Sequence, residues 1–434
     1  MNYHQTVFNS IVEKSIVEKS IVEKSIVEKS VVEKSVVEKS IVKIGLGSAT
    51  DIGGGVENQD DSYIIETPEF VVLSVLDGHG SSGKFFANSS KKIMEQKITE
   101  KKNALLDDPV NFIHDCFIEL HAQLTDELII HLNSNGYETK IDTDGCVVQK
   151  SKYADTWRRT KCGGTTKSMI VLIKSTLKLY IANVGDSDAL LCCTSDILSP
   201  TDLHTEKDSV SLIVKENPLS NNMVLTGNHS PNNPTEYTRM RTFCPSDKNK
   251  LFASAEFIYD NQINDKTYCS PIFRIHENGN PIIIPAIAGN CYYKNVRKEY
   301  ASYVVTPKHA EQESRLSNTR SLGDHNLKQY GVSCSPEIQS IELLSLFCKL
   351  EEEEEEPVLG IVLATDGVWD NWLYKDVSDF IMYDSCLKAS ASDLENGTQK
   401  VADSFMERNM LFSKRNFGQS ADNATVVTMY IRKC

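Results

Sequence analysis

Val71–Gly80 reads VVLSVLDGHG, and this stretch predicts a buried strand that ends in a tight turn. Five of its first six residues are Val or Leu, and the chain then breaks into Asp77-Gly78-His79-Gly80. The two glycines lack Cβ atoms, so the backbone can approach a small ligand closely. A carboxylate and a backbone carbonyl are ligands that hard cations prefer. Taken alone, the stretch is equally consistent with an ordinary turn and with a metal site.

Other apolar runs in the chain have acidic residues at their ends in the same way. Residues 360–370 read GIVLATDGVWD, and residues 179–187 read LYIANVGDS. Near the two ends of the chain, NQDD (58–61) precedes YII, and Asp422-Asn423 precedes ATVVTM. The acids next to these five runs are Asp60 and Asp61, Asp77, Asp186, Asp366 with Asp370, and Asp422. We expect the five strand ends to meet at one edge of a sheet and to form a shared metal centre.

Composition limits the classes of function that the chain can have. The 434 residues can form one large domain or two, and 40% of them are hydrophobic. The net charge of −14 argues against nucleic acid as a main partner. Twelve cysteines without a CxxC zinc pattern predict reduced thiols. The sequence shows no secretory signal and no apolar run that could span a membrane, so we expect a soluble, intracellular, cytoplasmic monomer without membrane contact.

Residues 11–40 are six tandem five-residue units, four of IVEKS and two of VVEKS. The Ile-Val pair advances about 140° around a helix with each unit, and it alternates between the two faces of a strand. Neither structure would therefore bury one continuous apolar face. We interpret residues 1–43 as a flexible low-complexity tail. The alternative is an interaction arm, and in both cases the folded domain is expected over 44–434.

Several segments of this domain have a predictable character. Apolar spacing predicts helices at about 84–101, 108–133, 374–383 and 394–411. Residues 134–161 are polar and are expected to form an irregular loop. Residues 243–304 show little periodicity and predict an inserted flap over the edge of the core. Six consecutive glutamates, 351–356, predict a solvated tip between two strands.

Six motifs, taken together, resemble those of the metal-dependent type 2C Ser/Thr protein phosphatases. They are VLDGHG (75–80), CGGTT (162–166), ANVGDSDALL (182–191), NTRSLGD (318–324), VLATDGVWD (362–370) and SADNATVV (420–427). They occur in the order that the family has and span most of residues 45–434. HSPNNPTEYTRMR, YKNVRKE and YGVS look most like the branches found in protists, algae and large DNA viruses. A viral source would place the protein in the host cytoplasm or the virion.

The resemblance implies an α+β fold, an αββα sandwich of two antiparallel β-sheets flanked by helices, with an inserted flap. It also implies a site for two Mn²⁺ or Mg²⁺ ions at one edge of the sheets. Asp77 would bridge the ions and take part in catalysis, the Gly78 carbonyl would bind one ion, and Asn423 would support the site. The other implied metal ligands are Asp60 or Asp61, Asp366 and Asp422, and Asp186 and Asp370 for a third, weaker ion.

The implied activity is hydrolysis of phosphoserine and phosphothreonine in phosphorylated protein substrates. A water activated between the two cations would attack phosphorus in line. His79 would act as general acid and give a proton to the leaving Ser or Thr oxygen.

This sequence departs from the family pattern before the first core strand. NQDD can be aligned as Gln59-Asp60 or as Asp60-Asp61, so either Asp60 or Asp61 can be the site acid. The phosphate-binding Arg of the family is missing, and Val56 or Gly55 stands in its place. The candidates to replace this cation are Lys84, Arg158, Arg159 and Arg320.

Three hypotheses follow for the function. The first is an active phosphatase, because unpaired carboxylates held close together repel one another and a lost function should erode them. The second is a pseudophosphatase, a binding or regulatory module without turnover, which the missing Arg favours. The third is a scaffold whose repeat arm recruits partners and in which catalysis is secondary.

Overall fold

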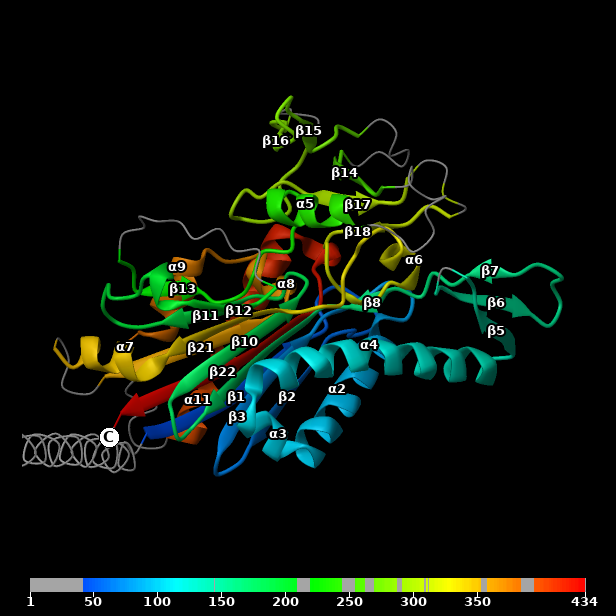
Figure 1. Ribbon diagram of the computed structural model, residues 1–434. Helices are drawn as coiled ribbons and strands as arrows, with labels where there is room; N and C mark the ends of the chain where they lie inside the picture. The colour runs from blue at the N-terminus through cyan, green and yellow to red at the C-terminus, as the bar shows by residue number, and fades with distance from the viewer. Residues whose placement is uncertain are drawn as a thin grey trace, which may run out of the picture.

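The computed structural model describes residues 42–143, 145–208, 219–243, 254–261, 269–286, 291–307, 310, 312–352, 357–383 and 394–433. The repeat tail that the sequence predicts, except for its last two residues, lies outside these ranges. Two antiparallel sheets pack face to face, and helices cover both outer faces (Figure 1). The predicted αββα sandwich is confirmed. No helix in the described ranges is both long and apolar enough to cross a bilayer.

The first sheet joins the beginning and the end of the folded chain. Its five described strands, in spatial order, are β1 (Val42–Asp51), β22 (Ala424–Lys433), β21 (Val358–Ala364), β11 (Ala189–Cys192) and β13 (Asn222–Val224). β1 and β22 pair along their whole length, with Val42 opposite Lys433 and Asp51 opposite Ala424. The residues just before β22 are thereby fixed beside the end of β1.

The second sheet contains the strand that the sequence analysis started from. Its six described strands, in spatial order, are β12 (His204–Lys207), β20 (Glu337–Glu342), β10 (Lys178–Val184), β9 (Lys167–Ile173), β3 (Phe70–Leu76) and β2 (Asp61–Glu66). β3 lies between β9 and β2 and is buried over all seven residues. Because β3 has neighbours on both sides, the position of Asp77 at its end is fixed by two strand registers.

Side chains alternate between two cores along each central strand, as the twofold period of a strand requires. In β3, Val71, Leu73 and Val75 enter the core between the sheets, and Val72 and Leu76 face the helices. These helices are α2 (Gly83–Glu100), α3 (Lys102–Asp107) and α4 (Pro109–Ser134). Apart from Ser74 the run is apolar, because both of its faces are covered.

Helix α4 has a start signal and an apolar stripe that the sequence shows directly. Asp108 accepts a hydrogen bond from the Asn111 N–H at 3.2 Å, and Pro109 takes the first helical position. Its predicted apolar stripe is buried, from Phe112 to Leu128. The predicted helix over 108–133 is confirmed.

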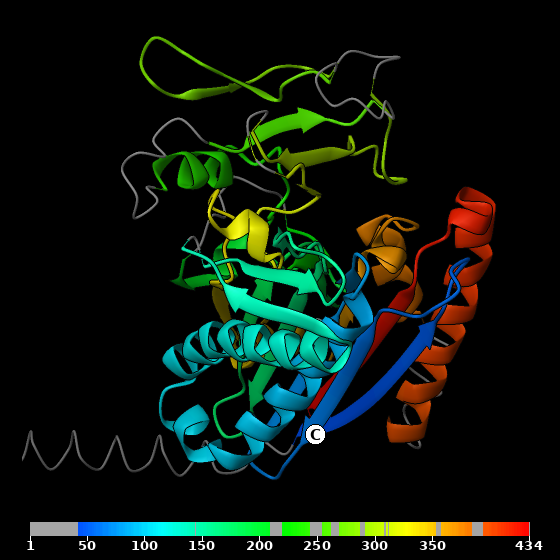
Figure 2. The same cartoon turned by 90° about the vertical axis from the view of Figure 1, so that its right-hand side faces the viewer.

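The other outer face is covered by α8 (Asp366–Trp369), α9 (Tyr374–Ile381) and α11 (Leu394–Asn416). Helix α11 lies against β1 (Figure 2), and the closest approach is at Gly45 and Gly47 of the strand. A Cβ atom at Gly47 would lie only 2.7 Å from the Thr398 carbonyl oxygen. α11 therefore packs close to the strand, and it runs five residues beyond its predicted end.

A smaller layer, the cap lobe, consists of the described residues between Pro234 and Val332 and lies over one end of the sandwich (Figures 1 and 2). Its elements are α5 (Pro234–Thr242), β14 (Glu256–Tyr259), β15 (Phe273–Ile275), β16 (Pro281–Ile283), β17 (Ser302–Val305), β18 (Arg315–Leu316), β19 (Leu322–Gly323) and α6 (His325–Lys328). A separate apolar cluster, including Phe257, Phe273 and Val304, holds it together. The described parts of the range 243–304, which was predicted as a flap, belong to this lobe.

Two local expectations are wrong. The segment expected as an irregular loop forms a three-stranded sheet of β5 (Tyr137–Ile141), β6 (Val147–Ser151) and β7 (Arg158–Arg159). Lys140 of β5 and Lys150 of β6 lie over the Trp157 ring, so cation–π contacts join these two strands to the residue before β7. The glutamate run follows a helix, α7 (Leu343–Leu350), and not a strand, and residues 353–356 lie outside the described ranges.

The described part of residues 195–228 contains a short 3-10 helix, η1 (Pro200–Asp202), with β12 and β13. Ser199 caps η1 by accepting from the Thr201 N–H. Every cysteine in the described ranges is a free thiol.

Candidate metal centre

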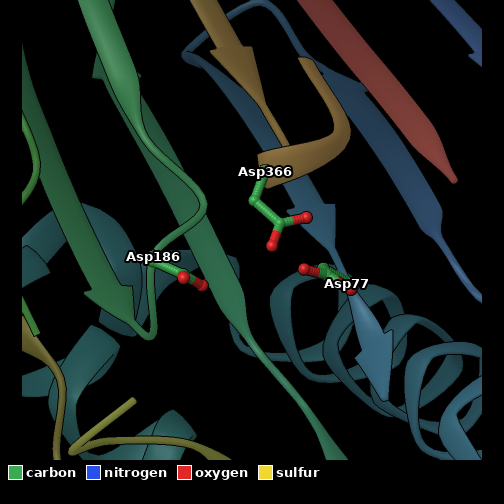
Figure 3. Close-up of side chains that lie close together, drawn as sticks. All are labelled: Asp77, Asp186 and Asp366. Carbon is green, nitrogen blue, oxygen red and sulfur yellow. The ribbon is translucent and has the colours of Figure 1, made fainter. Parts of the chain in front are cut away.

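Three acids from three different strand ends meet at one edge of the sandwich (Figure 3). Asp77 follows β3, Asp186 follows β10, and Asp366 begins α8 directly after β21. One carboxylate oxygen from each of the three lies within 4.8 Å of the other two. The structure therefore brings together three of the acids that the sequence pattern selected.

A small sheet holds the turn after β3 in place. β4 (Gly78–His79) pairs with β8 (Gly164–Thr165), which also pairs with β19. The Thr166 N–H and the Thr165 hydroxyl both donate to the Asp77 carbonyl oxygen, at 2.8 and 3.0 Å. The CGGTT and SLGD motifs thus fix the backbone on which Asp77 and His79 stand.

Two glycines in this small sheet are required by close contacts. A Cβ atom at Gly78 would lie 2.4 Å from the Gly83 carbonyl oxygen. Gly163 has a φ of +84°, and a Cβ there would lie 2.0 Å from the His79 carbonyl oxygen. Larger side chains at these positions would displace the metal-site turn itself.

The adjacent acids Asp60 and Asp61, at the start of β2, have different partners in the structure. The Thr365 hydroxyl, next to Asp366, donates to Asp60 Oδ2 at 2.8 Å. Burial raises the pKa of Asp60 to about 7 against the opposing effect of hydrogen bonds from Thr365 and Thr425. Asp61 instead forms an ion pair with Lys91 at 2.9 Å. The geometry therefore favours Asp60 as the site acid.

Asn423 connects the two ends of the fold at this site. Its side-chain oxygen accepts from the Gln59 N–H at 2.7 Å, and its side-chain nitrogen donates to the Ile52 carbonyl at 2.7 Å. Asp422, the preceding residue, lies close enough to Asp60, Asp77 and Asp366 for its charge to raise their pKa values. Burial of the carboxyl and the nearby Asp186 raise the Asp422 pKa, and a hydrogen bond from the Asn423 N–H opposes this rise.

Asp370 lies at the far side of the cluster, one helical turn after Asp366. Burial raises its pKa to about 6, and the ammonium of Lys294 opposes this rise. Its Oδ1 atom is buried and has no hydrogen-bond partner among the described residues. An unsatisfied buried carboxylate oxygen is a group that a cation can satisfy.

The electrostatics of the cluster fit a hard divalent cation. Burial, and then the neighbouring carboxylates, raise the pKa values of Asp77 and Asp366 well above the ordinary range of Asp. Such crowding is unfavourable unless a cation neutralises it, and carboxylate oxygens are the donors that Mg²⁺ and Mn²⁺ prefer. The donor set therefore suits the ions that the sequence predicts.

His79 has a partner that the sequence analysis did not identify. Its Nε2 lies 2.8 Å from Oδ2 of Asp324, the last residue of NTRSLGD. Burial lowers the pKa of His79, but the Asp324 carboxylate outweighs it and raises the value to about 9. Burial likewise raises the pKa of Asp324, and the facing imidazolium lowers it to about 2. The two groups form a charged pair.

None of the four candidate cations contacts the acid cluster in the described structure. Lys84 pairs with Glu57, Arg159 with Asp142 and the buried Arg320 with Glu236. Arg158 belongs to β7, beside the Trp157 hairpin. The cation that does reach the cluster is Lys294 of the cap lobe, whose Nζ lies 3.5 Å from Asp186 Oδ2. No local pattern marks it, because its position depends on how the cap lobe folds back.

Sequence comparison places these features in a known context. A family model described as "Protein phosphatase 2C" matches residues 65–250 and 272–410. "Probable protein phosphatase 2C 73" of Oryza sativa subsp. japonica is 25% identical over 272 residues, which are 62% of this chain and 43% of that protein. "Protein phosphatase 1H" of Danio rerio is 32% identical over 100 residues, 20% of this chain and 18% of that protein. The chain thus spans less than half of the length of either relative.

One solved structure shares the fold at low sequence identity. A Caenorhabditis elegans sex determining protein superposes with a TM-score of 0.50 and 14% identity, over 89% of this chain and 64% of that one. "Crystal structure of serine-threonine phosphatase 2C from Toxoplasma gondii" matches with a TM-score of 0.49 and 18% identity, over 89% of this chain and 94% of that one. At 14% identity, the similarity to the Caenorhabditis elegans protein is evidence for the fold alone.

Proposed function

The chain belongs to the protein phosphatase 2C family, and on that premise we propose that it is a metal-dependent protein serine/threonine phosphatase. The observation that carries this proposal is the convergence of Asp77, Asp186 and Asp366 at one sheet edge, with His79 two residues from Asp77. A carboxylate cluster and an acid in the same turn are what hydrolysis of a phosphate ester requires.

The metal ligands are assigned from this geometry and the family motifs together. Asp60, Asp77, the Gly78 carbonyl, Asp366 and Asp422 would hold two divalent cations, Mn²⁺ or Mg²⁺, and Asp186 with Asp370 would face a third position. When bound, such ions polarise the phosphoryl oxygens and lower the pKa of a water molecule. The protein's part is to hold these carboxylates at the ends of five separate strands.

His79 is the residue that we assign to proton transfer. Its Nε2–H donates to Asp324, so Nδ1 is the ring nitrogen that is free to serve the leaving oxygen of Ser or Thr. The Asp324 carboxylate favours the protonated ring, so a proton is available at neutral pH. Assistance of this kind contributes about 10²–10⁴-fold in rate.

The cavity next to His79 supports a protein substrate. Its volume is about 560 Å³, and its lining includes His79, Lys161, Tyr303 and Arg315. The cavity lies between the small sheet and the cap lobe, so a phosphorylated side chain can enter with part of its peptide. Phosphorylated proteins are therefore the proposed partners.

One observation favours a pseudophosphatase as the second candidate. No Arg stands at Gly55 or Val56, and the Val56 side chain is fully exposed. A site without that bidentate cation would hold phosphate less tightly. The acid cluster favours the active enzyme, because without metals these carboxylates cost stability and serve no packing role.

We also propose that the chain belongs to the branch of the family found in protists, algae and large DNA viruses, which the motifs HSPNNPTEYTRMR, YKNVRKE and YGVS support. We further propose that it is a cytoplasmic protein without nucleic-acid partners, which its acidic net charge supports.

Hydrolysis of a phosphothreonine peptide tests the proposed function. The assay compares the wild type with Asp366→Asn, across Mn²⁺ and Mg²⁺ concentrations. Asp376→Asn, which alters an exposed acid in the first turn of α9, is the matched control. We expect turnover by the wild type and the control, and a loss of about 10³-fold or more in Asp366→Asn. Equal rates in all three proteins, at the level without protein, would establish the pseudophosphatase.

A further inference from the structure

A segment of the cap lobe, Tyr292–Glu299, reaches down onto the metal centre, and we call it the strap. The Val296 N–H donates to the Asp370 carbonyl at 3.1 Å. The guanidinium of Arg297 donates to the Trp369 carbonyl and lies 4.8 Å from the centre of the Tyr374 ring. The strap is thus fixed to α8 and to the residues that follow it, so the side chain of Lys294 is held beside the acids.

Lys294 is surrounded by acids of the metal centre. Its Nζ lies 3.5 Å from Asp186 Oδ2, and its side chain is 25% exposed. Asp366 and Asp370 line the same cavity as Lys294 and Asp186. A lysine ammonium carries its positive charge at neutral pH.

The cavity that Lys294 enters is suited to a cation and not to phosphate. It has a volume of about 300 Å³. The carboxylates in its lining are Asp186, Asp188, Glu299, Asp366 and Asp370. Among the described residues that line this cavity, the only other lysine or arginine is Arg297, which pairs with Glu299 at 3.0 Å. With acids in excess, an anion would be repelled from this side of the centre.

We propose that Lys294 is a tethered cation of the metal centre, which takes the place of a divalent ion between Asp186 and Asp370. This inference rests on the proposed metal centre, and it means that the wild-type centre holds two divalent ions and not three. A charge that is part of the chain has a high effective concentration at its site, so it competes well with free ions. The ammonium also repels any divalent ion that approaches Asp186.

Binding of Mn²⁺ without substrate tests the inference. Calorimetry and equilibrium dialysis would compare the wild type, Lys294→Met, Lys294→Gln and the charge-preserving Lys294→Arg. Lys298→Met is the matched control, because Lys298 belongs to the same strap but is exposed. We expect Lys294→Met and Lys294→Gln to bind one more Mn²⁺ per chain than the wild type, with an affinity at least about tenfold higher than any such ion has in the wild type. Lys294→Arg and Lys298→Met should match the wild type.

Thermal unfolding supplies a second readout that needs no catalysis. Without metal, Lys294→Met leaves the acids without their cation, so its Tm should fall below that of Lys298→Met. Saturating Mn²⁺ should remove the difference. An unchanged number and affinity of ions in both neutral variants would overturn the inference while leaving the phosphatase proposal intact. Absence of Mn²⁺ binding in the wild type would contradict the metal centre itself, and the inference with it.

Discussion

Lys167 of β9 is a buried lysine in the core between the six-stranded sheet and α4. Its Nζ donates to the Tyr63 hydroxyl at 2.9 Å and to the Ser74 hydroxyl at 2.8 Å, and it lies 5.8 Å from the centre of the Phe117 ring. No carboxylate contacts it in the described structure. Burial therefore lowers the Lys167 pKa to about 7.

Replacing Lys167 with Met should increase stability, because it removes a desolvated charge and keeps the side-chain volume. We expect a gain of about 1–3 kcal/mol in the free energy of unfolding at pH 7. Between pH 7 and 10.5 the unfolded lysine binds a proton that the folded one does not, so wild-type stability rises with pH there. The advantage of Lys167→Met should accordingly shrink toward pH 10.5. Urea unfolding of both proteins at pH 7, 8.5 and 10 measures this, and an advantage that does not change with pH would contradict it.

Asp324 is expected to act on catalysis through His79. Asp324→Asn removes the carboxylate that holds the His79 pKa high, and burial then lowers that pKa. The alkaline limb of the kcat–pH profile should move to lower pH by at least about one unit, with kcat at pH 8 reduced by about tenfold or more. KM for the peptide should change little. Steady-state kinetics from pH 6 to 9.5 check this, and a lower kcat with an unshifted profile would mean that Asp324 serves only to hold the fold.

At the scale of the elements, the sequence was informative where strands are apolar on both faces. β3, β21 and β22 could be predicted because their runs are largely apolar and an acid lies within two residues of one end of each run. β5 to β7 could not, because these strands are rich in polar residues and four of the five residues of β5 are exposed. In such strands, pairing with the neighbouring strand decides the structure more than local composition does.

The same reasoning applies to the site. Asp77, Asp186 and Asp366 could be selected because each stands at the end of a recognisable strand. The choice between Asp60 and Asp61 depended on Lys91 of α2, which is remote in sequence. Asp324 and Lys294 could not be given roles, because pairing of β19 with β8 and the folding back of the strap bring them to the site.

The packing of α8 on β22 is expected to depend on Gly367. A Cβ atom at this position would lie 1.8 Å from the Asn423 carbonyl oxygen. Gly367→Ala should therefore push Asp366 away from Asp422, with a loss of about 2–4 kcal/mol in stability and weaker Mn²⁺ binding. Chemical unfolding and calorimetry measure both effects. Gly55→Ala is the control, because its nearest neighbouring atom would lie 3.5 Å away, and equal behaviour of the two variants would contradict the packing argument.

At the scale of the whole molecule, the sandwich supplies rigid strand ends and the cap lobe supplies the strap and one wall of the cavity. Each has its own apolar core. The acids come from both sheets, so the metal centre forms only when the two sheets are packed. Binding of Mn²⁺ should therefore stabilise the fold as a whole.

The repeat tail should be dispensable for the fold and for hydrolysis. β1 begins at Val42 and pairs with β22 over its full length, so deletion of residues 1–41 leaves every described strand pair intact. Because no described contact is lost, the free energy of unfolding should change by less than about 1 kcal/mol, and the Tm of the shortened protein should therefore stay within about 2 °C of the full chain. Its kcat should be unchanged. Deletion of residues 1–47 is the contrast, because it removes the first six residues of β1. Loss of activity or of cellular partners in the shorter deletion would favour the scaffold hypothesis.

The most direct test of the central claim is an anomalous difference map from crystals grown with Mn²⁺. The claim is that acids from separate strand ends form one divalent-metal centre. It predicts strong Mn²⁺ peaks in contact with Asp77, with Asp366 and Asp422 among the ligands and Lys294 still beside Asp186. A map without peaks at Asp77, or with Mn²⁺ bound only elsewhere on the surface, would contradict it.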